Sequence, residues 1–255
     1  MSDFREQFLE RVTRELFHRK GEGFVLKGGA ALRTLFGEQR LTKDIDLDFT
    51  NPKRSADSLH KTIQRAIQAA ARGLPLQNLR VSDPGKTETS PRWKINFQDD
   101  AGQLCHVEIE VSRDARRAVP GRVKQVAYVP LAAKGIARFW VDIYDEPALI
   151  ATKIAALLGR EVPRDVYDLD LLMNASPAPS AQLIDWAVEH ASLSGADPVA
   201  TLWSHLDGLT WQRFCAELQA SLPATVSRRV DEAEWTAMKL RVGDYVQRLL
   251  QKQPP

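Results

Sequence analysis

Apolar residues recur at helical spacing at the start of the chain and alternate with polar residues in the stretch that follows. The helical period predicts an amphipathic helix over residues 3–19, with an apolar face made of Phe4, Phe8, Leu9, Val12, Leu16 and Phe17. Short apolar or alternating runs predict strands at residues 24–26, 44–49, 79–82, 93–97, 104–112 and 124–129. Helices are expected at residues 30–36 and from Pro52 to Gly73. The first part of the chain therefore combines a sheet with several helices.

The second part of the chain reads as helical throughout. Asp145-Glu146-Pro147 is typical of a helix start, because proline is tolerated in the first helical turn. Pro163 predicts the start of another helix, and a last helix is expected over residues 228–250. The change of pattern predicts a domain boundary near residue 145.

Composition indicates an ordinary soluble protein. The chain has 255 residues, of which 44% are hydrophobic and 27% are charged, so it can bury a sizeable core. No apolar run is long enough for a membrane span, and the first residues lack the pattern of a signal peptide. Cys105 and Cys215 are too few for a disulfide framework or a zinc site, so a cytoplasmic protein is expected.

The formal net charge of +2 hides an uneven distribution of charge along the chain. Basic residues dominate between residues 112 and 138, where they are Arg113, Arg116, Arg117, Arg122, Lys124, Lys134 and Arg138. Acidic residues dominate between residues 165 and 226. A basic segment suits a polyanionic ligand such as RNA or DNA, whereas the plainer interpretation is solvated surface charge.

Three aspartates alternate with apolar residues in the predicted strand at 44–49. Side chains two apart on a strand share one face, so Asp44, Asp46 and Asp48 are expected to point the same way. Adjacent carboxylates repel one another unless a cation lies between them, and Mg²⁺ prefers oxygen ligands. A calcium loop is excluded, because it would need glycine and glutamate where this chain has Phe49 and Ser55.

A pair of glycines, Gly28 and Gly29, precedes this acidic strand. Glycine lets the backbone approach a ligand closely, and the free N–H groups of a helix start suit phosphate. No Walker sequence is present, which argues against a P-loop enzyme. Lys27 and Arg33 flank the glycines and are candidates for phosphate contacts. A phosphate-binding turn beside metal-binding carboxylates indicates nucleotide chemistry.

The sequence resembles a known family at three places. The segments 26–33 and 44–47 resemble the AbiEii/AbiGii toxins, including the MenT toxins, within the polymerase-β-like nucleotidyltransferase superfamily. The segment 106–112 resembles the strand that holds the third carboxylate of that family. Lys153 and the Arg164-Asp165-x-x-Asp168 sequence resemble its later motifs, so the resemblance covers roughly residues 20–172. It implies an α+β fold, with a mixed-sheet nucleotidyltransferase domain at 1–145 and a helical C-terminal domain at 146–255.

The resemblance assigns roles to the acidic residues of the first domain. Asp44 and Asp46 are implied as catalytic metal ligands, and a neighbouring strand must supply a third carboxylate. Glu108 and Glu110 are both candidates, because alternation places them on one face. The ending Glu-hydrophobic-small that is usual in the family favours Glu110, with Glu108 as the alternative.

The resemblance also assigns roles in nucleotide binding. Gly28, Gly29, Arg33 and Lys153 are implied to contact the nucleotide, with Lys153 on the triphosphate. From the residues alone, a lysine in an apolar helix usually extends its ammonium to the surface. Asp165 is implied to act in catalysis or to orient the lysine, whereas an acid in the first turn also simply suits the helix dipole.

These assignments imply a metal-dependent nucleotidyltransferase. The cofactor would be Mg²⁺, with Mn²⁺ as the alternative, and the reaction would move a nucleoside monophosphate from an NTP to an acceptor hydroxyl. The implied acceptor is the 3′ end of tRNA, with an antitoxin as partner of a monomeric toxin and no membrane contact. The alternatives are a protein or small-molecule hydroxyl as acceptor, or a non-catalytic nucleotide-binding module.

Overall fold

The computed structural model describes residues 4–18, 23–37, 42, 44–51, 54–82, 84, 89–113, 118–133, 135–191, 193 and 195–252. The chain divides into two compact units, and each is considered by itself. Unit 1 consists of residues 1–118 and 123–143, whereas unit 2 consists of residues 119–122 and 144–255.

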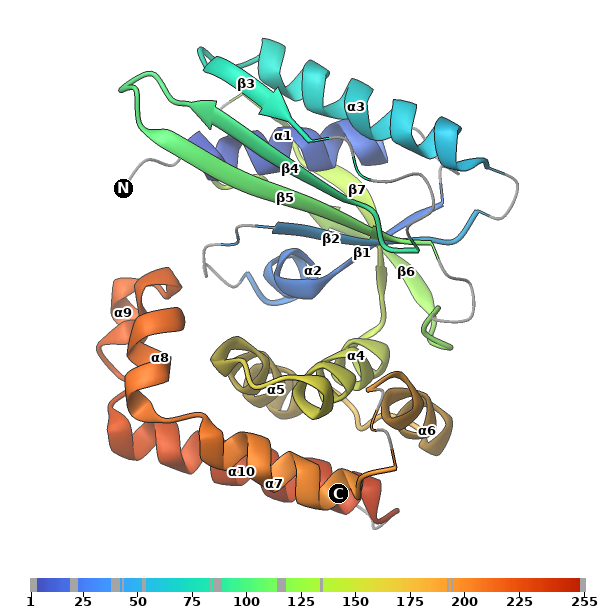
Figure 1. Ribbon diagram of the computed structural model, residues 1–255, viewed down its shortest axis with the longest axis vertical. Helices are drawn as coiled ribbons and strands as arrows, with labels where there is room; N and C mark the ends of the chain where they lie inside the picture. Colours follow the sequence, from blue (N-terminus) through green and yellow to red (C-terminus); the bar gives the residue numbers. More distant parts are fainter. Residues whose placement is uncertain are drawn as a thin grey trace. The chain divides into compact units, whose positions relative to one another are not determined.

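Unit 1 is built on a seven-stranded mixed sheet (Figure 1). Its strands are β1 (Phe24–Lys27), β2 (Asp44–Phe49), β3 (Gln77–Val81), β4 (Arg92–Gln98), β5 (Leu104–Ser112), β6 (Val123–Tyr128) and β7 (Phe139–Tyr144), whose last residue belongs to unit 2. They are arranged in the order β3-β4-β5-β2-β1-β7-β6. β2 pairs with β5 in parallel and with β1 antiparallel, and β1 pairs with β7 in parallel. The mixed sheet confirms the expected fold class for this part of the chain.

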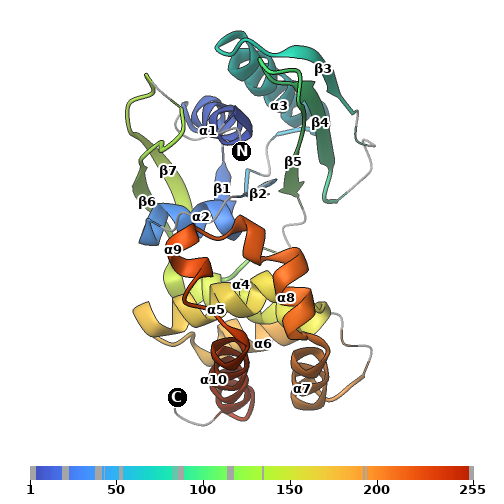
Figure 2. The same ribbon diagram turned by 90° about the vertical axis from the view of Figure 1, so that its left-hand side faces the viewer.

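Three helices belong to unit 1: α1 (Phe4–Phe17), α2 (Gly28–Phe36) and α3 (Ala56–Arg72). Helices α1 and α3 pack against each other and lie together over the strands (Figure 2). The ring of Phe97 on β4 contacts that of Phe8 on α1, with centroids 4.9 Å apart, and Trp93 contacts His60 on α3. The apolar face of the sheet is therefore covered by α1 and α3, which leaves the charged side chains of β2, β4 and β5 on the opposite face.

The structure corrects the predicted elements of unit 1 at three places. Helix α2 begins at Gly28 rather than at residue 30, so the two glycines form its first turn. Helix α3 begins after Ser55, whose side chain accepts a hydrogen bond from the N–H of Ser58 as an N-cap. Strand β7 was not predicted, although it pairs with the middle of the sheet at Leu26. Its alternating aromatic and β-branched residues are typical of a strand.

Unit 2 is helical, as predicted. Its helices are α4 (Glu146–Gly159), α5 (Pro163–Ala175), α6 (Ala181–His190), α7 (Pro198–Gly208), α8 (Trp211–Glu217), a 3-10 turn at Gln219–Ser221, α9 (Ala224–Ser227) and α10 (Glu232–Leu250). Helix α4 packs against α5, α6 and α7, and α10 packs against α5 and α7. The last helix starts at Glu232 rather than at residue 228, because the Asp231 side chain caps it by accepting from the Glu234 N–H.

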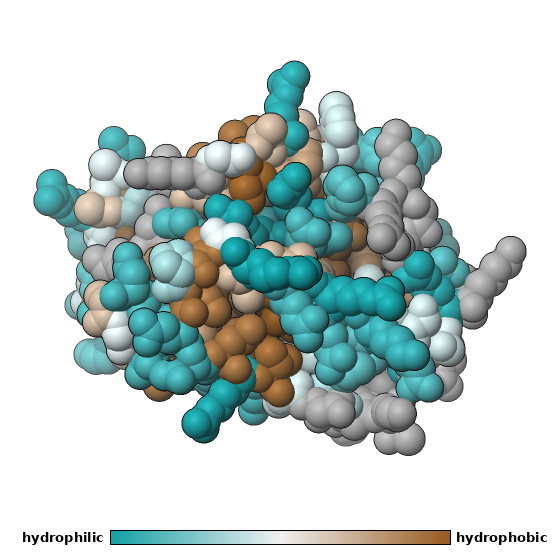
Figure 3. Space-filling view, turned by 90° about the horizontal axis from the view of Figure 1, so that it is seen from above, coloured by the Kyte–Doolittle hydropathy of each residue, from teal (hydrophilic) through white to brown (hydrophobic). Residues whose placement is uncertain are grey.

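The described surface contains a few large apolar side chains among many hydrophilic ones. Leu104 is 75% exposed and Trp140 is 58% exposed. The face in Figure 3 is mostly hydrophilic, with apolar atoms gathered near its middle. Within the described residues, no helix is long and apolar enough to cross a membrane.

Candidate functional site

The predicted acidic strand has the alternation that its sequence implies. In β2, Ile45, Leu47 and Phe49 are buried in the core. Asp44 and Asp46 are half-buried, whereas Asp48 is buried. Two of the three carboxylates are therefore accessible from the face of the sheet that α1 and α3 leave uncovered.

The register of β2 and β5 places both candidate glutamates beside these aspartates. Asp46 is the direct partner of Glu110, and Asp44 is the direct partner of Glu108. Residues directly paired on adjacent strands point to the same face, and the strands lie about 4.8 Å apart. Asp44, Asp46, Glu108 and Glu110 are thus gathered on one face by the sheet alone. Both glutamates are accessible there, and the choice of Glu110 over Glu108 stays a prediction.

Two basic residues flank the Asp46–Glu110 pair. Lys27 on β1 is the direct partner of Asp46, and Arg92 on β4 is the direct partner of Glu110. The Arg92 Nη2 donates to Glu110 Oε2 at 2.6 Å. Lys27, Asp46, Glu110 and Arg92 therefore form one line across four strands, which we call the charge row. The row is neutral in formal charge, with its two acids in the middle.

Lys27 is held at the charge row by a buried carboxylate. Its Nζ donates to Asp48 Oδ1 at 2.7 Å. Burial by itself lowers the pKa of Lys27, but the attraction of Asp48, together with that of Asp46 and Glu110, outweighs burial and raises the pKa above its ordinary value. Lys27 therefore remains a fixed cation at neutral pH and above.

Gly28 lies against the Asp46 carboxylate. A Cβ built on Gly28 would be 2.2 Å from Asp46 Oδ2, which is a severe clash. Gly28 also has a φ of +64°, a region that side-chain-bearing residues rarely adopt. Gly28 and Gly29 are the first two residues of α2, whose first N–H groups lack partners within the helix. Glycine is required at position 28 so that the start of α2 can lie directly beside the Asp46 carboxylate.

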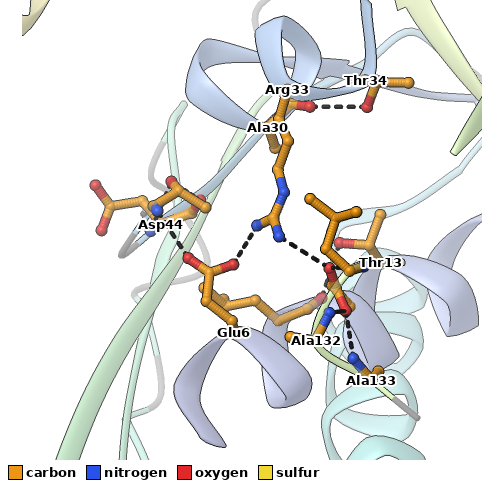
Figure 4. A network of polar contacts seen from close by, with 12 residues as sticks. Glu6, Thr13, Ala30, Arg33, Thr34, Asp44, Ala132 and Ala133 are labelled. Atoms are coloured by element: carbon orange, nitrogen blue, oxygen red, sulfur yellow. Dashed lines mark hydrogen bonds and ion pairs between the residues drawn. The ribbon is translucent and has the colours of Figure 1, made fainter. Parts of the chain in front are cut away.

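Arg33 is engaged in a buried network rather than on the charged face (Figure 4). Its guanidinium donates to Glu6 Oε2 and, at 3.1 Å, to Glu10 Oε1. Both glutamates belong to α1 and are buried. A contact between Arg33 and a triphosphate, as predicted from the sequence, would require these ion pairs to break. The geometry favours a supporting role in which Arg33 fastens α2 to α1.

The same two glutamates hold backbone segments that lie far apart in the sequence. Glu10 accepts hydrogen bonds from the N–H groups of Leu131, Ala132 and Ala133 at 2.8, 2.9 and 2.7 Å. Glu6 accepts from the N–H of Thr42 at 2.8 Å, just before the acidic strand (Figure 4). The network therefore connects α1, α2, the start of β2 and the segment after β6.

The predicted residues of unit 2 also form a cluster. Lys153 lies in the apolar helix α4 and is only 8% exposed. Its Nζ is 3.1 Å from Asp165 Oδ1 and 2.6 Å from Asp168 Oδ2. Both aspartates, on α5, are fully buried. The lysine is therefore buried between two carboxylates rather than extended to the surface.

Arg160 completes this cluster. It follows α4 and donates to Asp165 through Nε at 2.9 Å and Nη2 at 3.3 Å. Burial by itself raises the pKa of Asp165, but Lys153 and Arg160 outweigh burial, so the pKa lies below its usual value. Asp165 is therefore a fixed anion that orients two cations, one of which is half-exposed.

The donors of unit 1 fit a hard divalent cation. Among the described residues, no three acidic, histidine or cysteine side chains are already clustered as a metal site. Mg²⁺ is, however, usually held by one or two carboxylates together with water and substrate phosphates. Asp46 and Glu110 lie side by side with Asp44 on the same face, and the missing Cβ of Gly28 lets the Asp46 carboxylate lie directly against the start of α2. The arrangement suits an ion that arrives with a phosphorylated substrate.

Five residues of these networks were missed or left open by sequence reasoning: Glu6, Glu10, Lys27, Arg92 and Arg160. Lys27 was a candidate for phosphate contact, and the other four were not predicted. Arg92 on β4 lies directly opposite Glu110 on β5, but this pairing can be recognised only once the strand register is known. Glu6 and Glu10 are one helical turn apart and both are buried, but they lie outside the apolar face of the helix, so nothing in the sequence signals their burial.

Comparison with known proteins agrees with this fold. The family model described as "Nucleotidyl transferase AbiEii toxin, Type IV TA system" matches residues 12–250. JHP933 from Helicobacter pylori has a similar structure, with a TM-score of 0.56 at 16% identity, over 97% of this chain and 92% of that one. MenT4, a nucleotidyltransferase toxin from Mycobacterium tuberculosis H37Rv, has a TM-score of 0.55 at 15% identity, over 100% of this chain and 96% of that one. No curated protein gives a significant match.

Proposed function

Because the chain belongs to the AbiEii family of nucleotidyltransferase toxins, we propose that it transfers a nucleoside monophosphate from an NTP to the 3′ end of an RNA, with tRNA as the acceptor. The acceptor oxygen bonds to the α-phosphorus, the bond to the β-phosphate breaks, and pyrophosphate leaves. The observation that carries this proposal is the pairing of Asp46 with Glu110 directly beside Gly28.

In the proposed mechanism, Asp44, Asp46 and Glu110 hold Mg²⁺. The bound ion would neutralise charge on the triphosphate and activate the attacking hydroxyl. Gly28 and Gly29 offer backbone N–H groups to a phosphate close to these carboxylates. Arg92 donates to Glu110 Oε2, so it would neutralise and orient this carboxylate while Oε1 would be the oxygen offered to the ion.

The cluster of unit 2 supplies a second set of charges. We assign Lys153 to the triphosphate, where a compact ammonium stabilises charge that develops on the leaving group. Asp165 would orient Lys153, and it also accepts from Arg160, which is half-exposed. This assignment follows the motifs that the chain shares with the family.

The acceptor is tested by following the label from NTP to product. The protein is incubated with Mg²⁺ and each α-labelled NTP in turn, together with tRNA, total RNA or a protein extract. We expect label on tRNA from at least one NTP, no label from the γ-labelled form, and no product with Asp46→Asn. Label on a protein would contradict the RNA acceptor but keep the reaction class. No labelled product with any acceptor would contradict the proposal altogether.

The basic segment at 112–138 is the proposed contact for the RNA backbone. Arg116, Arg117 and Lys134 lie outside the described residues, whereas Arg113 and Arg122 lie within them. Replacing Arg113, Arg116, Arg117 and Arg122 by glutamine should weaken tRNA binding. It should also lower the slope of log affinity against log salt by about 0.9 per lost phosphate contact. NTP binding should be unchanged. An unchanged salt slope would place the acceptor elsewhere.

The family also implies an antitoxin that neutralises this activity. We propose that the protein is the toxin of such a pair and acts by blocking translation through modified tRNA. Expression of the wild type should then arrest growth, and expression of Asp46→Asn should not. Growth arrest by the inactive variant would contradict this cause of toxicity.

A further inference from the structure

Asp48 is the carboxylate that holds Lys27, although Lys27 is paired in register with Asp46. The Lys27 Nζ donates to Asp48 Oδ1 at 2.7 Å, a diagonal contact to the next residue on the same face of β2. Asp48 is 5% exposed, whereas Asp46 is half-buried. The ammonium is therefore drawn along the strand, toward the buried acid.

This diagonal contact decides whether Asp46 is open to other cations. Directly paired residues have Cβ atoms about 5 Å apart, and lysine is a flexible point charge on a four-carbon stem. Lys27 is therefore long enough to reach Asp46 in the absence of Asp48. An ammonium on Asp46 would occupy the carboxylate oxygens and repel a divalent ion.

We propose that Asp48 is a positioning residue that anchors Lys27 and so keeps Asp46 open for a divalent cation. This inference rests on the proposed role of Asp46 as a metal ligand. Lys27 stays close to Asp46 in this arrangement, so its positive charge still opposes the incoming ion. The negative charge of Asp48 offsets that opposition, and the pair together has little net effect on cation binding.

The two residues should then affect metal affinity in opposite directions. Asp48→Asn frees Lys27 to pair with Asp46 and removes a negative charge, so the affinity for Mn²⁺ should fall about tenfold. Lys27→Met removes the opposing cation, so the affinity should rise by up to about tenfold. The double variant should bind Mn²⁺ nearly as the wild type does.

Mn²⁺ binding is measured on the full chain without nucleotide, by electron paramagnetic resonance of the free ion at constant ionic strength. Thermal melts in EDTA report on folding of each variant. Asp100→Asn and Lys61→Met make the same charge changes at exposed positions of unit 1 and serve as controls. Screened surface charges should change the affinity by less than about twofold.

The outcomes separate this inference from the proposed function. Opposite shifts that cancel in the double variant support the positioning role. Equal Mn²⁺ affinities in all variants, even with lower melting temperatures, would show that Lys27 and Asp48 form only a structural ion pair and would overturn the inference. Weaker Mn²⁺ binding by Lys27→Met would also overturn it. If Asp48→Asn fails to fold, Lys27→Met and the double variant still decide. A wild type that binds no Mn²⁺, even with an added non-hydrolysable NTP, would overturn the proposed metal site as well.

Discussion

Lys153→Met is the most informative single change in unit 2. Lys153 contacts both buried aspartates, at 3.1 Å to Asp165 and 2.6 Å to Asp168. Methionine has a similar length and fits the apolar helix, so the substitution removes the charge without a large cavity. It removes the positive charge that lies between two fully buried carboxylates, whereas the contact of Arg160 to Asp165 is kept.

The expected cost is large because a buried charge loses its partner. Breaking a buried ion pair from one side typically costs about 3–5 kcal/mol in the free energy of unfolding. For a chain of this size, each kcal/mol lowers the melting temperature by about 2–4 °C, so the decrease should be on the order of 10 °C. Arg160→Met should cost only about 1 kcal/mol, because the arginine is half-exposed and Asp165 keeps Lys153.

The pH dependence should change sign. In the wild type the pKa of Asp165 is lowered, so its stabilising contribution is complete above the unfolded value of about 4 and is lost as the pH falls through the lower folded value. In Lys153→Met, the two like charges favour a retained proton in the folded state. The folded state then binds more protons than the unfolded state above the unfolded pKa of about 4, so the variant should become more stable as the pH falls toward that value.

Urea unfolding followed by circular dichroism at several pH values measures both effects. Lys239→Met is a matched control, since this lysine also lies on a helix of unit 2 but donates to the backbone oxygen of Leu206. The control should cost about 1 kcal/mol and keep the pH slope of the wild type. A Lys153→Met variant within about 1 kcal/mol of the wild type, or one with the same pH slope, would refute the reasoning.

Four further substitutions test unit 1. Asp46→Asn should abolish transfer with little loss of stability, as checked by single-turnover assays and thermal melts, because it removes a charge at an accessible position. Glu110→Gln should lower the single-turnover rate by several orders of magnitude and Glu108→Gln by about tenfold or less, and the reverse order would exchange their roles. Gly28→Ala should lower both melting temperature and transfer rate, since its Cβ would displace the Asp46 carboxylate, and a fully active variant would contradict the close contact.

The local elements of unit 1 could be predicted because their periodicity is strong. Helix α1 and strand β2 lie where the apolar spacing placed them. Strand β7 was missed because its evidence is non-local: it pairs with β1 through Ile143 and Leu26, which are far apart in the sequence. It also ends directly at the helix start of Asp145, whose capping signal dominated the interpretation.

Only those site residues that lie in recognisable sequence motifs could be predicted. The glycines, the aspartates and Lys153 are recognisable in the sequence, and the match to the AbiEii family confirms the resemblance that they carry. The protein partners of Arg92 and Arg33 could not be predicted, because they depend on strand register and helix packing. An arginine near a glycine turn suggests phosphate, yet Arg33 satisfies two buried glutamates instead.

The two cations of the charge row also offset the repulsion among the clustered carboxylates of β2 and β5. Asp44, Asp46, Asp48, Glu108 and Glu110 lie on neighbouring positions of one face, and such a group would repel itself in the absence of cations. Lys27 neutralises the most buried of these acids and Arg92 neutralises Glu110, so the flanking strands stabilise the acidic centre from both sides. These two ion pairs lower the repulsion among the acids in the absence of a bound cation. These flanking cations must also leave Asp46 open if Asp46 is to bind a divalent cation. The diagonal contact of Lys27 to Asp48 meets this condition, because it holds the ammonium on Asp48.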